Sequence, residues 1–144
     1  MEPLRAPPAL SLPLPLRWVR AHGLAGLTPW HFIDEEQERE GLRRQYRLEV
    51  STGSQPWADV LPFARRQDRD DIAAFHVKDG IPQDLVLEIH LTWSAGPERP
   101  GYPGVQRYDD FWAWLQSAVA DSGQWCNEDD LRHLVGEGGG APYR

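Results

Sequence analysis

The side chains most able to do chemistry gather between residues 65 and 71. This short segment holds three arginines and three aspartates, which are Arg65, Arg66, Arg69, Asp68, Asp70 and Asp71. Three carboxylates this close together could bind a hard cation such as Mg²⁺ or Ca²⁺. The central glycine and closing glutamate of a calcium-binding loop are absent, however. We therefore favour an exposed turn whose charges largely neutralise one another. A charged surface for a partner is the second interpretation, because loops often carry binding residues.

The five histidines offer little support for a metal site. None has the spacing of a zinc protease motif, and no Cys–His zinc pattern occurs. His76 and His90 fall on neighbouring predicted strands and could face one another across the sheet. Two imidazoles alone make an incomplete site, so ordinary sheet-surface histidines are the simpler interpretation. A metal-dependent hydrolase that uses Asp68, Asp70 and Asp71 with one of these histidines is the least favoured hypothesis.

A nucleophile is equally hard to identify. Cys126 and His133 are seven residues apart, but a catalytic cysteine also needs a group that orients its base, and the sequence does not place one. The glycines near the C-terminus are not followed by a helix that could bind a phosphate group. The sequence therefore predicts no catalytic residue, no metal ligand and no bound cofactor.

Composition limits the possible partners. A chain of 144 residues has the size of one domain, and its formal net charge is −7. That charge disfavours nucleic-acid binding, which needs clustered lysine and arginine, and suits a basic partner. A single cysteine excludes an intrachain disulfide bond. No apolar run has the length of a membrane span or the form of a signal peptide, so we expect a cytoplasmic protein of undetermined oligomeric state.

Three apolar runs, separated by polar turns, predict consecutive strands at about 59–65, 71–77 and 85–91. Pro62 lacks an N–H donor, so the first strand should lie at a sheet edge or have an interrupted ladder. The third strand alternates between apolar residues and a partly polar outer face, which consists of Val86, Glu88 and His90. Lys78-Asp79-Gly80 is a typical hairpin turn.

Helices are expected on both sides of these strands. One runs through Trp18 to Gly23, and another over 34–46, where acidic residues precede basic ones as a helix dipole favours. Thr28-Pro29 indicates a turn or a helix start. After a long loop at 94–107, helical spacing places five residues on one face, with Trp114 more exposed: Tyr108, Phe111, Trp112, Leu115 and Val119.

The expected ends of this last helix are an N-cap at Asp109 or Asp110 and a C-cap at Gly123. The order of elements is helices, then strands, then a helix. It predicts an α+β fold in which helices from both ends of the chain cover one face of an antiparallel sheet.

Four segments in this order resemble the SUKH superfamily, which includes the Smi/Knr regulators of cell-wall synthesis and many bacterial proteins. The segments are Pro29–Asp34, Leu61–Phe75, the strand ending Ile89-His90, and Tyr108–Leu115. The resemblance covers residues 28–122. It leaves a Pro-rich arm with a short helix at 1–27 and a C-terminal extension with a Gly-rich tail at 123–144.

The resemblance implies an α+β fold and a non-enzymatic protein-binding role. Many bacterial members are similar to immunity proteins that neutralise toxins, often nucleases. Acidic clusters at 34–40, 68–71 and 128–130 would suit the basic surface of such a toxin. The expected partner-binding residues are Arg65, Arg66, Asp68, Asp70 and Asp71. A regulatory or scaffold protein of the cell-wall-regulator type is the alternative.

Overall fold

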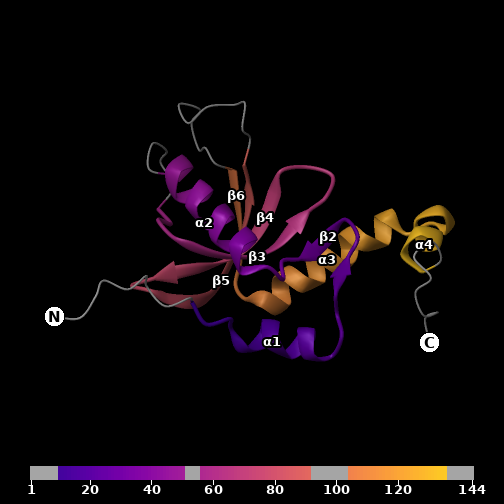
Figure 1. The fold of residues 1–144 in the computed structure, drawn as a ribbon, viewed down its shortest axis with the longest axis horizontal. Coiled ribbons are helices and arrows are strands. Elements are labelled where there is room, and N and C mark those ends of the chain that lie inside the picture. The colour runs from indigo at the N-terminus through magenta and orange to yellow at the C-terminus, as the bar shows by residue number, and fades with distance from the viewer. Residues whose placement is uncertain (1–9, 51–55, 92–103, 136–144) are drawn as a thin grey trace.

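A six-stranded antiparallel sheet, with its strands in chain order, forms the centre of the molecule (Figure 1). The structure is a computed structural model that describes residues 10–50, 56–91 and 104–135. The strands are β1 (Gly26–Leu27), β2 (Trp30–Phe32), β3 (Val60–Arg66), β4 (Asp71–Lys78), β5 (Ile81–His90) and β6 (Gly104–Tyr108). The helices are α1 (Leu14–Ala21), α2 (Glu36–Val50), α3 (Phe111–Trp125) and α4 (Glu128–Val135). The predicted α+β fold is confirmed.

Helices cover both faces of the sheet, so the expectation of one covered face is wrong. Helix α2 packs on one face, and α1 and α3 pack on the other (Figure 1). The strand face that carries Val86 and Glu88 was expected to point outward, but it lies beneath α3. Helix α4 continues from the end of α3 and projects beyond the sheet (Figure 1). No described helix is long and apolar enough to cross a bilayer.

The three predicted strands are confirmed as β3, β4 and β5. The turn between the last two has the left-handed backbone that an Asp-Gly hairpin requires, with φ of 52° at Asp79 and 77° at Gly80. Because this turn is so tight, pairing begins at once between Lys78 and Ile81, and β5 starts four residues before the predicted position. Pro82 and polar neighbours hid this part of the strand from the apolar pattern.

Pro62 lies in the third of six strands, so its predicted edge position is wrong. The other predicted outcome holds, because the pairing of β3 with β4 shifts between Pro62 and Ala64. Such an irregularity accommodates a residue that cannot donate to the ladder. Burial extends along both sides of this strand, since Leu61 and Phe63 face α3 while Val60 faces α2.

Several elements escaped the sequence analysis. Thr28-Pro29 forms the turn that was one of its two predicted outcomes, but it is followed by a strand, Trp30–Phe32, and not by a helix. Strand β6 occupies the end of the loop expected at 94–107. The rest of that loop, the first part of the expected arm and the Gly-rich tail lie outside the described residues. Helix α3 runs through Gly123 to Trp125, with Cys126 as its C-cap.

Helix α3 turns a different face to the sheet from the one predicted. Phe111, Trp114 and Ala118 are buried, whereas Trp112 is 43% exposed and Val119 is 53% exposed. Trp112 and Val119 fit a helical stripe that starts at Tyr108, but Tyr108 ends β6 and the helix begins only at Phe111, from which Trp114 and Ala118 follow at helical spacing. The Asp110 side chain caps the helix by accepting a hydrogen bond from the Ala113 N–H at 2.9 Å. The prediction that Trp112 is core and Trp114 more exposed is therefore wrong.

Candidate functional site

The turn between β3 and β4 carries most of the predicted site residues. Its residues 67–70 are exposed, and they border a hollow of about 550 Å³. We call this the turn hollow; it is lined by His31, Arg65, Arg66, Gln67, Asp68, Arg69 and Asp70. Four of the five predicted partner-binding residues therefore lie together at one opening on the surface. The fifth, Asp71, is only 7% exposed.

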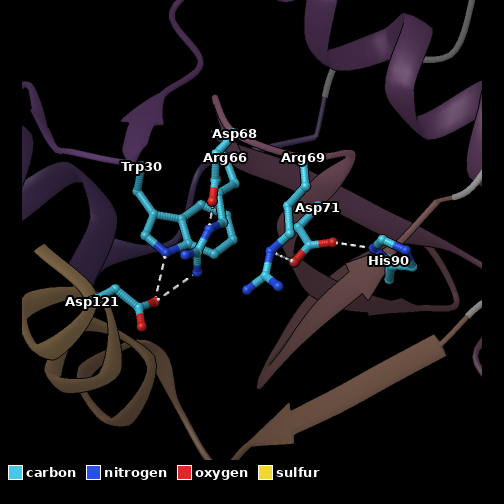
Figure 2. Close-up of polar contacts among 7 residues, drawn as sticks. All are labelled: Trp30, Arg66, Asp68, Arg69, Asp71, His90 and Asp121. Carbon is cyan, nitrogen blue, oxygen red and sulfur yellow. Dashed lines mark hydrogen bonds and ion pairs between the residues drawn. The ribbon is translucent and has the colours of Figure 1, made fainter. Parts of the chain in front are cut away.

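Asp71 joins strands instead of facing a partner. Its carboxylate pairs with Nδ1 of His90, which lies directly opposite on β5, and with Nε of Arg69 at 3.0 Å (Figure 2). The less favoured alternative, in which His76 faces His90, is wrong, because His76 lies opposite Val60 of β3 at the other end of β4. Burial and the charge on Lys78 lower the pKa of the His76 imidazole.

Arg66 is fixed in place by carboxylates from two elements. Its Nε donates to Oδ1 of Asp68 at 2.7 Å, and its Nη1 donates to Oδ2 of Asp121 at 3.2 Å (Figure 2). The same Asp121 oxygen accepts the indole N–H of Trp30 at 3.1 Å. The Arg66 guanidinium carbon also lies 5.8 Å from the centre of the Trp30 ring. Helix α3 therefore helps to build the wall of the turn hollow through Asp121.

These contacts keep the hollow charged. Burial alone would raise the pKa of Asp68, but the hydrogen bond from Arg66 and one from its own backbone N–H lower it below the ordinary value. Burial alone would lower the pKa of Arg66, but Asp68 and Asp121 raise it. Five carboxylates surround the three arginines of the turn: Glu38, Asp68, Asp70, Asp71 and Asp121. Only Asp68 and Asp70 of these line the hollow itself, so its three arginines are neutralised with the help of Glu38, Asp71 and Asp121.

Arginines compete directly with any cation for these carboxylates. Asp68 binds Arg66, and Asp71 binds Arg69 and His90. Within the described residues, no group of three or more His, Cys, Asp or Glu side chains is arranged to hold a metal ion. The metal-dependent hydrolase remains a prediction that these observations do not test.

Glu88 of β5 lies on the face of the sheet that α3 covers. One of its carboxylate oxygens is buried without a hydrogen-bond partner among the described residues, and so is the indole nitrogen of Trp114. Burial raises the pKa of Glu88, and the charges on Asp71 and Asp121 add to this effect, while the nearby Trp114 N–H opposes it without reaching good hydrogen-bond geometry. No sequence pattern indicated this buried carboxylate, because the strand face of Glu88 was expected to meet solvent.

A second hollow adjoins the first and shares His31 and Gln67 with it. It measures about 460 Å³ and lies between the β1–β2 hairpin and the junction of α3 with α4. We call it the α4 groove; its main apolar lining residues are Leu27, Trp125, Leu131 and Leu134. Cys126 also lines it and is exposed, but no hydrogen bond joins Cys126 to His31 in the described structure.

The sequence contained a signal for α4 that the prediction did not use. Asn127 is followed by three acidic residues and then by basic ones, which is typical of a capped helix. In the structure, Oδ1 of Asn127 accepts a hydrogen bond from the Asp130 N–H at 2.8 Å.

No family model, curated protein or solved structure matches the chain. The resemblance to the SUKH superfamily therefore remains a prediction.

Proposed function

We propose that this chain is a non-enzymatic protein-binding module that recognises a basic protein in the cytoplasm. The observation that carries the proposal is the turn hollow, an open site where each of the three lining arginines is already paired with a carboxylate, while the exposed Asp70 makes none of the described ion pairs. The net charge of −7 makes the molecule as a whole acidic. Complementary charge speeds encounter with a partner and disfavours wrong partners.

The walls of the turn hollow are suited to recognition because they are already in place. Arg66 is held by Asp68, Asp121 and the Trp30 ring, and Arg65 donates to Glu38 of α2 at 2.8 Å. Side chains that are ordered before binding lose less conformational entropy when a partner arrives. Asp70 is exposed at the tip and belongs to none of the ion pairs found in the described residues. We assign it the first contact with a partner cation.

The partner class that we propose is a toxin domain with a basic, phosphate-binding surface. A nuclease must hold phosphates with lysine and arginine, so an acidic protein can compete for the same surface. This role agrees with the immunity function that the SUKH resemblance implies. It requires only that the chain covers the toxin surface, without any bond being made or broken.

The test is to purify the toxin domains encoded beside this chain in its genome and measure their binding by calorimetry. We expect a one-to-one complex at micromolar concentration or tighter, which weakens as salt is added. Growth rescue of cells that express the toxin would then show neutralisation. If none of these domains binds at micromolar concentration and none is neutralised, the proposal is wrong.

A charge-reversal variant links such binding to the turn hollow. We expect Asp70→Lys to weaken the complex about tenfold, mainly by slowing association, since exposed interface charges act on the encounter rate. Asp84→Lys is the matched control, because Asp84 is also exposed but lies on β5 outside the hollow. Equal effects of the two variants would show that only the total charge matters.

A further inference from the structure

Helix α4 presents an apolar side that the described structure does not cover. None of its residues is buried, and Leu131 and Leu134 are 45% and 60% exposed. These two leucines are three residues apart, so they lie on the same side of the helix. An isolated helix of eight residues is only marginally stable in water, and tertiary contacts normally stabilise such an element.

The leucines of α4 form one wall of the α4 groove. Leu27 of β1 and Trp125 at the end of α3 supply further apolar lining, while Thr28, Ser122 and Asn127 add polar groups. An exposed apolar patch with a polar rim is typical of an interaction site. The groove also opens beside the turn hollow, since His31 and Gln67 line both.

We propose that the α4 groove binds an amphipathic helix of the basic partner. This inference rests on the proposed function and identifies the segment of the partner that is recognised. The apolar side of the bound helix lies against Leu131, Leu134 and Trp125. Its lysine or arginine residues lie beside the acidic first turn of α4. This is the helix-in-groove mode of recognition, in which a few apolar side chains anchor the segment.

Charge identifies the bound helix as basic. The first turn of α4 consists of Glu128, Asp129 and Asp130, and Asp130 lines the groove itself. Arg132 pairs with Asp129 at 2.6 Å, and among the described residues no ion pair joins either of the other two carboxylates to a cation. A cation on the partner would fill this role.

Two other occupants fit the observations less well. An added strand would need a long edge to pair with, but β1 at this edge of the sheet has only two residues. A second copy of this chain related by a two-fold axis would bring two identical acidic turns together. Like charges that meet in an interface oppose binding.

Cys126 makes the groove accessible to a direct test. It is exposed, lines the groove and is the only cysteine in the sequence, so thiol alkylation reports on this place alone. The probes are two synthetic helical peptides with identical leucine positions, one flanked by lysines and the other by glutamates. We expect the lysine peptide to slow iodoacetamide labelling of the full chain at least tenfold, with one-to-one saturation. The glutamate peptide should have no effect.

Variants separate the groove from general stickiness. We expect Leu134→Asp to weaken the lysine peptide at least tenfold, whereas Ile81→Asp should not, although Ile81 is similarly exposed at 62% and the charge change is identical. Glu128→Lys keeps both leucines and should also weaken binding. It therefore tests the contribution of the acidic first turn to peptide binding even if Leu134→Asp unwinds α4. Far-ultraviolet circular dichroism would reveal such unwinding.

Three results would overturn the inference. These are no protection of Cys126 by the lysine peptide at 100 μM, equal protection by both peptides, and labelling that slows with protein concentration alone, which would indicate a second copy. The proposed function fails separately, through loss of toxin binding. If toxin binding stays sensitive to Asp70→Lys while all peptide effects are absent, the groove inference is wrong and the proposed function stands.

Discussion

The two faces of the sheet bury polar groups in different ways. On the α2 face, Arg43 donates two hydrogen bonds to Asp59, at 2.8 and 2.6 Å. The Tyr46 hydroxyl on the same helix donates to the backbone carbonyl of Trp57. The hydrogen bonds to Asp59 outweigh burial and raise the pKa of Arg43, so the guanidinium stays charged. This face is held by paired groups.

The α3 face depends on aromatic packing instead. The Trp114 ring meets Phe63 edge-on at 4.8 Å and Trp30 at 5.3 Å between ring centres. Near this aromatic cluster, Glu88 is surrounded by other carboxylates and has no cation in contact among the described residues. The comparison shows that a buried charge is kept where an arginine meets it, and that burial favours the protonated carboxyl where no cation is in contact with it. In the turn hollow, Arg66 is the cation that pairs with the carboxylates of Asp68 and Asp121.

The largest effect should come from removing the centre of the aromatic cluster. Trp114→Ala deletes a side chain that is 1% exposed and leaves a cavity between α3 and the sheet. Truncations of this kind cost about 3–5 kcal/mol of unfolding free energy. Urea unfolding followed by circular dichroism measures the loss.

Trp112→Ala is the matched control, because it removes the same side chain two residues earlier on the same helix. Since Trp112 is 43% exposed, we expect it to cost less than half as much as Trp114→Ala. The reverse order would show that α3 turns its other face to the sheet. The dependence of the α3 face on Trp114 would then be disproved.

Breaking the charge pair on the α2 face should have the second-largest effect. Asp59→Asn removes the negative charge that receives both Arg43 hydrogen bonds. Hydrogen bonds to charged groups contribute about 1.5–3 kcal/mol, so we expect a loss of about 2 kcal/mol. Thermal and urea unfolding at pH 7 measure it.

The control for this pair is Asp34→Asn. Asp34 pairs with Arg20 of α1, but its side chain is mostly exposed. Exposed ion pairs contribute about 0–1 kcal/mol, so this variant should be nearly neutral. If Asp59→Asn were equally neutral, the α2 face would depend on apolar packing alone, and the contrast between the faces would disappear.

The fold could be predicted where one pattern left a single choice. Apolar runs separated by polar turns predicted β3 to β5, and Asp79-Gly80 predicted the hairpin between β4 and β5. The short strand at Trp30–Phe32 has too few residues to show a period. Trp112 fits a helical stripe from Tyr108 and Trp114 fits one from Phe111, and only packing against the sheet selects Trp114.

The candidate site shows the same limit. Charge density placed Arg65, Arg66, Asp68 and Asp70 at one turn, and the structure agrees. The contact of Asp121 with Arg66 spans 55 residues and that with Trp30 spans 91, so no local pattern could reveal it. Asp121 reaches both residues only because α3 crosses the sheet. That Asp71 is buried likewise depends on its cross-strand neighbour His90.

Glu88 should make stability depend on pH in the opposite sense to a paired carboxylate. Its pKa in the folded chain is raised above the ordinary 4.5 by burial and by the charges on Asp71 and Asp121. The folded state then holds the Glu88 proton more tightly than the unfolded state does. The resulting stabilisation is complete below pH 4.5 and is lost as the pH rises through the folded pKa.

We therefore expect Glu88→Gln to be more stable than the natural chain at neutral pH. The gain should be smaller than the loss caused by Asp59→Asn, because Glu88 keeps some contact with solvent. Its advantage should shrink as the pH is lowered toward 4.5. Urea unfolding from pH 4 to 8 measures the difference. A difference that does not change with pH would show that the pKa of Glu88 is the same in the folded and unfolded states, which contradicts the prediction.

Asp68→Asn should have the smallest effect and the opposite pH dependence. The hydrogen bond from Arg66 lowers the pKa of Asp68 below the ordinary 3.8, despite its burial. The folded state therefore holds this proton less tightly, and the ion pair stabilises the chain above pH 3.8. Because Asp68 is partly exposed and Arg66 keeps its bond to Asp121, we expect a loss of at most about 1 kcal/mol at pH 7.

The loss at Asp68→Asn should vanish as the pH falls through the folded pKa of Asp68, where Glu88→Gln has also lost its effect. Asp70→Asn is the control for the same turn, because Asp70 is exposed and we expect no change in stability at any pH. Equal losses from the two variants would mean that the pairing of Arg66 with Asp68 contributes nothing specific. Arg66 would then be fixed by Asp121 and Trp30 alone, and the walls of the turn hollow would depend on α3 and not on the turn itself.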